Sequence, residues 1–386
     1  MTEERERGFS TRLVHGEGDR DPSTGAIAVP IYQVSTFDWP DLEHPGAYDY
    51  ARSNNPTRRA LELAIADLER GHRGFAFASG MAATSTVLST FSQGDHLVVS
   101  EHVYGGTERV VSHVFRRFGI QATFVDAADL AAVREAVRPN TRALFLETPS
   151  NPYLSITDLR AAAAFARERG ILTIVDNTFM TPYLQRPLDL GCDVVIHSAT
   201  KFLAGHSDVI AGLVVAKDPE VAREIRFLQN ALGVVLGPQD SFLVLRGLKT
   251  LAVRLDREQA TATRVAEWLK ERPEVVEVCY PGLAGHPGRE IHFAQAAGPG
   301  AVLTFRLASP EIAHRLYARR KLPALAVSLG GVESILSVPA RMSHASLTPE
   351  RKRALGIDDT LARLSVGLED ASDLIGDLEQ ALAGEG

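Results

Sequence analysis

The strongest constraint on the fold is a regular alternation of short apolar runs with helical patterns between Gly74 and Val215. Each apolar run spans four or five residues, and a segment of helical period separates it from the next. The predicted strands are residues 74–78, 96–100, 121–125, 143–147, 172–176, 194–197 and 212–215. Such alternation predicts an α/β fold, with a mostly parallel sheet covered by helices.

The length of 386 residues exceeds the usual size of one hydrophobic core, so we expect a large and a smaller domain. Residues 1–60 lack the alternation, and we predict an arm that contacts a neighbouring subunit. The large domain is predicted over 61–255 and the C-terminal domain over 256–386. A helical segment over 239–271 is expected to link them, followed by strands at 275–279, 301–307 and 361–366 and helices at 310–319 and 370–383.

Composition narrows the partners and the compartment. The 41 Lys+Arg and 48 Asp+Glu residues give a net charge of -7 and are interspersed, which favours a small molecule over nucleic acid. The two cysteines, Cys192 and Cys279, form no disulfide framework or zinc motif, which indicates a reducing compartment. The N-terminus is charged, and no apolar run approaches the ~18 residues of a membrane span. We therefore expect a soluble cytoplasmic protein that does not bind a membrane.

Polar residues follow several of the predicted strands at their carboxyl ends. They form the segments 79–81, 148–152, 176–178 and 198–201. Ligands of parallel sheets bind where the carboxyl ends of the strands meet. The sequence therefore predicts one crevice that collects these groups.

Lys201 is a lone lysine among small hydroxyl residues in Ser198-Ala199-Thr200-Lys201. Free lysine has a pKa near ~10.4, and condensation with a pyridoxal aldehyde is one way to make its nitrogen reactive. The alternative is a solvated lysine at the start of a surface helix.

Asp176 ends the apolar run 171–175, which places its carboxylate at the floor of the crevice. A buried charge needs a partner, and the ring nitrogen of a pyridoxal cofactor is one. The alternative is an aspartate that caps the next helix through Asn177 and Thr178.

Ser79-Gly80-Met81 lies where a strand gives way to a helix, and a helix N-terminus can bind phosphate. An ordinary turn is the alternative. The chain contains neither GxGxxG nor GxxxxGK[ST], which argues against a nicotinamide-dependent dehydrogenase and a triphosphate site.

Tyr104 precedes Gly105 and Gly106, and its ring could stack on a flat cofactor. A core tyrosine beside a turn is the alternative. His197, His206 and Asp208 surround Lys201 in sequence, but their spacing matches no usual ligand pattern, so no metal is predicted.

The ordered set of motifs resembles the pyridoxal-phosphate enzymes of cysteine and methionine metabolism, and it covers nearly the whole chain. The motifs are Tyr50-Ala51-Arg52, Asn55-Pro56-Thr57, Ser79-Gly80-Met81, Tyr104-Gly105-Gly106-Thr107, Asn151-Pro152, Asp176-Asn177-Thr178-Phe179, residues 197–201, Gly205-His206-Ser207-Asp208, Ser328-Leu329-Gly330-Gly331 and Arg363-Leu364-Ser365-Val366-Gly367. The resemblance implies the fold of PLP-dependent transferases, fold type I. This fold has a large domain with a mostly parallel seven-stranded sheet and a smaller C-terminal α+β domain.

The resemblance also implies roles around the cofactor, pyridoxal 5'-phosphate. Lys201 would form the aldimine and move the Cα proton, through a quinonoid intermediate, and Asp176 would pair with the ring nitrogen. Tyr104 would stack on the ring, Asn151 would hydrogen-bond the ring oxygen, and Thr178 would lie against the ring face.

Two further groups of residues are implied in the same way. The phosphate would be held by Gly80, Met81, Ser198 and Thr200, with Tyr50 and Arg52 of a neighbouring subunit. Arg363 would bind the substrate α-carboxylate, with Ser328 and Asn151 beside it. The catalytic unit would then be a homodimer, commonly doubled to a tetramer.

Two positions bear on the reaction. Val327 stands where γ-synthases and γ-lyases commonly carry a glutamate, and Gly106 stands where dedicated methionine γ-lyases carry a cysteine. The resemblance therefore favours a carbon-sulfur lyase of the cystathionine β-lyase type, which acts on a sulfur-containing amino acid. Cystathionine γ-lyase, cystathionine γ-synthase and methionine γ-lyase are the alternatives. A non-catalytic PLP carrier is a further alternative, but the presence of both Lys201 and Arg363 argues against it, because a carrier needs no clamp for a substrate carboxylate.

Overall fold

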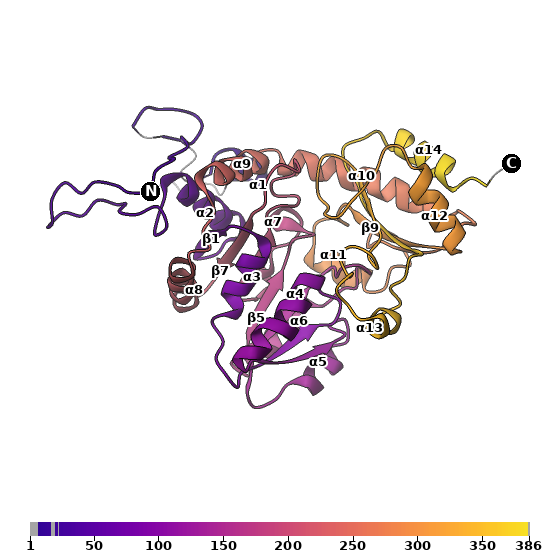
Figure 1. Ribbon diagram of the computed structural model, residues 1–386, viewed down its shortest axis with the longest axis horizontal. Coiled ribbons are helices and arrows are strands. Elements are labelled where there is room, and N and C mark those ends of the chain that lie inside the picture. Colours follow the sequence, from indigo (N-terminus) through magenta and orange to yellow (C-terminus); the bar gives the residue numbers. More distant parts are fainter. Residues whose placement is uncertain (1–6, 17–19, 22, 385–386) are drawn as a thin grey trace.

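The structure is a computed structural model, and it describes residues 7–16, 20, 21 and 23–384. Figure 1 shows an elongated molecule with three parts in a row. The N-terminal arm projects at one end, the large sheet lies in the centre, and the C-terminal segment forms the other end. None of the described helices is both long and apolar enough to cross a bilayer.

The central sheet has seven strands in the order β1-β7-β6-β5-β4-β2-β3. Strand β7 runs antiparallel to both of its neighbours, and the other paired strands are parallel, so the predicted mostly parallel sheet is confirmed. The strands are β1 Arg73–Phe77, β2 His96–Ser100, β3 Gln121–Val125, β4 Thr141–Glu147, β5 Leu172–Asp176, β6 Val194–Ser198 and β7 Gly212–Ala216.

Both faces of the sheet are buried. Along β7, Leu213 and Val215 belong to one apolar cluster, whereas Val214 and Ala216 belong to the cluster on the opposite face. Because successive side chains of a strand point to opposite faces, an apolar run without alternation is what a doubly covered strand requires.

Helices cover the sheet, and several begin at polar caps. The Ser79 hydroxyl accepts from the Ala82 N–H, and the Asn55 side chain accepts from the N–H groups of Thr57 and Arg58. The α-helices described in the first 232 residues are α1 Phe9–Val14, α2 Pro56–Glu69, α3 Gly80–Leu88, α4 Gly105–Arg109, α5 Leu130–Ala136, α6 Leu159–Arg167, α7 Thr181–Leu184 and α8 Pro219–Leu232, with a π-helix at Val110–Val114 and 3-10 helices at Phe115–Phe118 and Pro187–Leu190.

The helical segment predicted over 239–271 is present, and it is divided into two helices, α9 Pro238–Leu248 and α10 Leu251–Lys270. The Thr250 N–H and hydroxyl both donate to the Gly247 carbonyl at 3.2 Å. A threonine hydroxyl that competes for a helix carbonyl in this way ends the ladder of α9.

The C-terminal part contains a five-stranded sheet in the order β10-β11-β12-β9-β8. Its strands are β8 Val275–Cys279, β9 Val302–Leu307, β10 Ala324–Leu325, β11 Ile335–Ser337 and β12 Leu361–Ser365. Its helices are α11 Arg289–Gln295, α12 Pro310–Arg319, α13 Pro349–Ala354 and α14 Ala371–Leu382. The three predicted strands and two predicted helices are present, and β10 and β11 are additional.

Helix α10 takes part in two hydrophobic cores. Leu251 and Leu255 pack in the core of the large sheet, whereas Val265 and Leu269 pack in the core of the C-terminal sheet. The predicted domain limits at residues 60 and 255 therefore fall inside α2 and α10, and they stay a prediction.

Candidate active site

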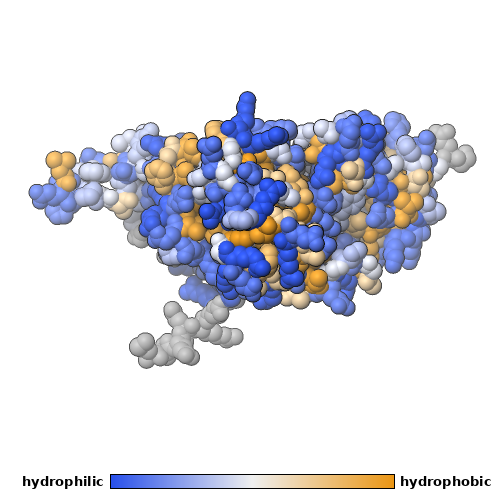
Figure 2. Space-filling view, turned by 90° about the horizontal axis from the view of Figure 1, so that it is seen from below, coloured by the Kyte–Doolittle hydropathy of each residue, from blue (hydrophilic) through white to orange (hydrophobic). Residues whose placement is uncertain are grey.

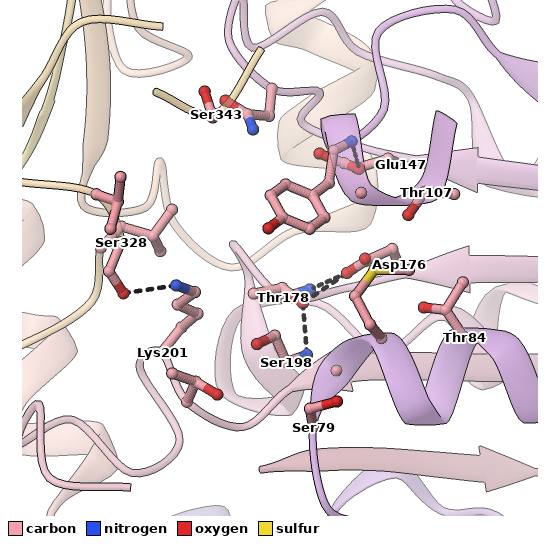
Figure 3. Close-up of a pocket in the computed structure, with 18 of the residues that line it drawn as sticks. Ser79, Thr84, Thr107, Glu147, Asp176, Thr178, Ser198, Lys201, Ser328 and Ser343 are labelled. Carbon is pink, nitrogen blue, oxygen red and sulfur yellow. Dashed lines mark hydrogen bonds between the residues drawn. The ribbon is translucent and has the colours of Figure 1, made fainter. Parts of the chain in front are cut away.

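A cavity of about 600 Å³ lies at the carboxyl ends of the large-sheet strands, and residues of the C-terminal part close one side of it. In Figure 3, Lys201 and Ser328 face each other on one side of this cavity, and Asp176 and Glu147 lie on the opposite side. The cavity brings together eleven of the predicted residues, namely Gly80, Met81, Tyr104, Asn151, Asp176, Thr178, Ser198, Thr200, Lys201, Ser328 and Arg363.

Lys201 lies in the turn after β6 and points into the cavity. Its Nζ donates to the Ser328 hydroxyl at 2.5 Å. Burial, with a smaller effect of the Arg363 charge, lowers the pKa of Lys201 to about 8. The alternative of a solvated lysine on a surface helix is therefore wrong, and the amine can become neutral close to physiological pH.

Asp176 ends β5 with its carboxylate at the cavity floor. Its Oδ1 accepts from the Thr178 N–H at 3.0 Å and from the Thr178 hydroxyl at 2.6 Å. The next helix, α7, begins only at Thr181, so Asp176 forms a local turn and does not cap that helix. Among the described residues none donates to Oδ2, and burial raises the pKa of Asp176. A protonated ring nitrogen is a partner of the type that such a carboxylate needs.

The other end of the cavity suits a phosphate group. Ser79 caps α3, and a Cβ added to Gly80 would lie 2.9 Å from the Ser198 Cβ, so glycine lets the helix N-terminus approach β6. No described residue pairs with the Ser198 hydroxyl. The Thr200 hydroxyl, in contrast, donates to the Ala211 carbonyl at 3.2 Å and accepts from the Ala211 N–H at 3.1 Å.

The Tyr104 ring is 42% exposed and lines the cavity, so the alternative of a core tyrosine is wrong. Gly106 makes room for this ring. A Cβ at position 106 would lie 2.4 Å from the Tyr104 Cε1 and 2.8 Å from the Met81 Sδ. The ring is therefore positioned to cover a flat ligand in the cavity.

Arg363 on β12 is buried beneath the cavity surface. Its Nη1 donates to the Asn151 Oδ1 at 3.0 Å and its Nη2 to the Ser328 carbonyl at 2.8 Å. The buried Nε has no acceptor in the described part of the chain. Burial lowers the pKa of Arg363 to about 10, which leaves the group charged and able to bind a carboxylate.

Tyr50 and Arg52 do not reach this cavity. The Arg52 Nη1 donates to the Asn230 carbonyl at 2.7 Å, and its guanidinium lies 5.4 Å from the centre of the Tyr50 ring. The buried Arg58 holds the turn between them, because its Nη1 donates to the Ala51 carbonyl at 2.8 Å. Both residues are exposed on the surface, and Arg52 lies against α8 of its own chain.

The histidines near Lys201 have other partners. His197 is fully buried, with its Nε2 at 2.7 Å from the Glu69 Oε1, and the His206 Nδ1 lies 2.7 Å from the Ala204 carbonyl. In the regions that the structure describes, no group of three or more His, Cys, Asp or Glu side chains could hold a metal ion.

Several parts of the cavity wall were not anticipated from the sequence. They are Thr84, Arg109, Glu147, Ile210 and the segment 342–346, which contributes Met342, Ser343, Ala345 and Ser346. The sequence pattern that predicted Asp176 as a site residue also applies to Glu147, because each is a polar residue at the carboxyl end of a buried strand. The segment 342–346 lies in irregular chain and has no periodic signal.

The residues present fit pyridoxal phosphate. Asp176 is available for the ring nitrogen, Tyr104 for the ring face, and the α3 N-terminus with Ser198 for the phosphate. Lys201 is a buried amine within the same cavity.

Comparisons with known proteins agree with this geometry. The model of the family "Cys/Met metabolism PLP-dependent enzyme" matches residues 10–383. The cystathionine beta-lyase MetC of Bacillus subtilis is 57% identical over 374 residues, which cover 97% of this chain and 96% of that protein. The cystathionine gamma-lyase of the same organism is 50% identical over 372 residues, which cover 96% and 98%.

A solved structure matches over nearly the same extent. The crystal structure of cystathionine gamma-lyase from Lactobacillus plantarum, complexed with L-serine, superposes with a TM-score of 0.95 at 46% identity. The match covers 97% of this chain and 98% of that one. The chain therefore belongs to the PLP-dependent enzymes of cysteine and methionine metabolism.

Proposed function

We propose that this enzyme is a cystathionine β-lyase, which converts cystathionine to homocysteine, pyruvate and ammonia. The proposal is supported by its relatives, because the Bacillus subtilis cystathionine beta-lyase is 57% identical and that of Lactococcus lactis is 49% identical. The Cys/Met family to which the chain belongs uses pyridoxal phosphate, and the residues that line the cavity support the choice of β-elimination.

When bound, pyridoxal phosphate supplies an aldehyde for amines and a ring that withdraws electrons from the substrate Cα. Arg363 holds the substrate α-carboxylate, with Asn151 and Ser328 beside the same guanidinium. Lys201 removes the Cα proton as a neutral amine, and its pKa of about 8 suits this role. Asp176, once ionised, holds the proton at the ring nitrogen.

The substrate has a second amino-acid end, and Arg109 is positioned for it. Arg109 is an exposed residue on α4 that lines the same cavity as the buried Arg363. Two guanidinium groups, one deep and one exposed, match a ligand with two carboxylates. This supports cystathionine over an amino acid with a single carboxylate.

Val327 is the observation that carries the choice between β and γ chemistry. Its side chain is 65% exposed and lines the cavity next to Ser328. Elimination at Cβ needs one proton removed from Cα, whereas γ-elimination needs a second proton removed from Cβ. A valine cannot take up that proton, so γ-elimination would leave Lys201 as the base for both protons, and the absence of a second base at position 327 supports β-elimination.

The second candidate is γ-elimination or γ-replacement. The Bacillus subtilis cystathionine gamma-lyase and the Mycobacterium bovis cystathionine gamma-synthase, at 50% and 48% identity, favour it. Lys201 lies in the same cavity in either case and could serve as the base for both protons.

The catalytic unit in this proposal is a homodimer, which forms a tetramer by pairing. The arm supports it, because Tyr50 and Arg52 are exposed and do not line the cavity of their own chain. Figure 2 shows apolar surface gathered on one face of the molecule, framed by hydrophilic residues. Phe227 on α8 and Ile210 at the cavity are 68% and 65% exposed, which suits burial against another subunit.

A cytoplasmic location is also part of the proposal. Cys192 and Cys279 are both free thiols, and a reducing compartment preserves such thiols.

The test is to incubate the enzyme separately with cystathionine, methionine and cysteine and to identify the keto acid and thiol. Pyruvate with homocysteine from cystathionine is the expected result. Formation of 2-oxobutyrate would instead assign γ-elimination. A parallel assay with an activated homoserine ester and cysteine detects γ-replacement, and no keto acid from any substrate would overturn the proposal.

A further inference from the structure

Glu147 is a buried acidic residue that the roles above do not use. It ends β4 and pairs in register with Asp176, which ends β5. Because neighbouring residues of parallel strands point to the same face, the two carboxyl groups lie side by side at the cavity floor (Figure 3). Glu147 is only 6% exposed.

Glu147 interacts with two loops. Its Oε2 accepts from the Tyr104 backbone N–H at 2.8 Å, and the backbone of Asn151 favours the charged form of the carboxyl group. The first loop follows β2 and carries the ring expected to cover the cofactor. The second follows β4 and carries the amide that contacts Arg363.

The electrostatic surroundings of Glu147 also lead to the substrate site. Burial, followed by the nearby Asp176, raises the pKa of Glu147, whereas the backbones of Tyr104 and Asn151 and the Arg363 charge act in the opposite direction. Glu147 in turn favours the charged form of the Arg363 side chain. Glu147 thus interacts with the Tyr104 loop, whose ring is expected to cover the cofactor, and with Arg363, which is expected to bind the substrate carboxylate.

We propose that Glu147 is a positioning residue, whose Oε2 fixes the backbone of Tyr104 and whose carboxyl group interacts with the neighbouring Asn151 loop and Arg363, and so couples ring contact to substrate binding. The inference rests on the proposed roles of Tyr104, Asn151 and Arg363. A buried N–H that loses its acceptor must move or remain unpaired, so loss of Glu147 displaces the Tyr104 ring and removes the neighbouring charge from the Asn151–Arg363 pair.

The test compares Glu147→Met with Glu147→Gln in the holoenzyme. Methionine keeps the length and apolar volume but removes the acceptor, and we expect KM for cystathionine to rise about tenfold or more, with a smaller change in kcat. The absorption and circular dichroism bands of bound pyridoxal phosphate should shift, because the ring environment changes. Glutamine keeps an acceptor oxygen, and it should restore KM to within about threefold and return the bands to their original positions.

Asp193→Ala is the matched control. The Asp193 Oδ2 accepts from the Thr173 N–H at 2.8 Å and from its hydroxyl at 2.7 Å, at the opposite end of β5 from the cavity. This variant should lose stability but keep KM and both spectral bands. If Glu147→Met does not fold, Glu147→Asp shortens the acceptor by one methylene and should raise KM with the same spectral shift.

Unchanged KM and bands in Glu147→Met would overturn the inference, as would a glutamine variant as impaired as the methionine variant. The proposed function is checked separately by the wild-type enzyme. If wild type forms no keto acid from cystathionine, that proposal fails, while the cofactor bands and the dissociation constant of pyridoxal phosphate still test Glu147.

Discussion

The Nζ of Lys201 lies 2.5 Å from the hydroxyl oxygen of Ser328, a residue 127 positions further along the chain. The Ser328 carbonyl also accepts from Arg363, so one serine contacts both the amine and the carboxylate-binding guanidinium. Its backbone has φ of 91°, in the left-handed region that favours glycine. Ser328 therefore combines a side-chain contact with backbone strain.

These two properties of Ser328 can be separated by substitution. Ser328→Ala removes the hydroxyl and keeps the strained φ, whereas Ser328→Gly removes the hydroxyl and relieves the strain. We expect kcat to fall about tenfold in both variants. Urea unfolding should show the glycine variant to be more stable than the alanine variant by about 1 kcal/mol. Equal stabilities would argue against strain at this position.

Lys201→Ala should abolish turnover, with a loss of at least about a thousandfold, and leave the chain folded. The substitution removes a buried amine, so thermal unfolding should occur at the same temperature or higher. Lys217→Ala is the control, since its Nζ donates to the Leu188 carbonyl at 2.9 Å and the residue does not line the cavity. Normal turnover in the Lys201 variant would contradict the assignment of the base.

Lys201 should also make the stability of the cofactor-free protein depend on pH. Its pKa falls from 10.5 to about 8 on folding, so the unfolded chain holds the proton more tightly between these values. Below pH 8 the folded protein carries the full cost of the buried charge, on the order of 3 kcal/mol, and rising pH relieves it. Lys201→Met should therefore be more stable than wild type near neutral pH, and the difference in unfolding free energy should shrink towards pH 10.5.

Arg363→Lys should raise KM about tenfold to a hundredfold, with less effect on kcat, because an ammonium cannot reproduce the planar fork of a guanidinium. Steady-state kinetics with cystathionine measures this. Arg315→Lys serves as the control, since Arg315 donates to the Leu382 carbonyl and does not line the cavity. Unchanged KM would remove Arg363 from the substrate site.

Mixing two inactive variants tests the shared site. Arg52→Ala leaves Lys201 intact, and Lys201→Ala leaves the arm intact. If the arm completes a partner's cavity, refolding the two chains together at equal amounts should restore about a quarter of wild-type activity, because half of the dimers are hybrids with one complete site. No recovery in the mixture, with each parent inactive, would show that the arm does not act between subunits.

Much of this site could be predicted because it lies at strand ends. Asp176 ends one buried strand and Lys201 follows the next, and these two strands are parallel neighbours. The carboxyl ends of parallel strands lie at the same edge of a sheet, regardless of the loops that connect them. The cap at Ser79 is a local interaction and is visible in the sequence for the same reason.

The missed features depend on contacts between distant segments. Strands β10 and β11 have two and three residues, too few to show a period, and they form only because they pair with each other and with β12. The break between α9 and α10 depends on one hydroxyl at Thr250 within an otherwise helical pattern. Segment 342–346 reaches the cavity by packing against Gly105, where a Cβ would lie 2.3 Å from the Ser343 carbonyl.

Helix α10 has a mechanical consequence for the enzyme. It is continuous from Leu251 to Lys270, and its two halves are anchored in different cores. A hinge at this point would have to break consecutive helical hydrogen bonds, so the helix acts as a rigid strut that resists separation of the two cores. Because each core supports one half of this helix, melting of either core removes support from the other.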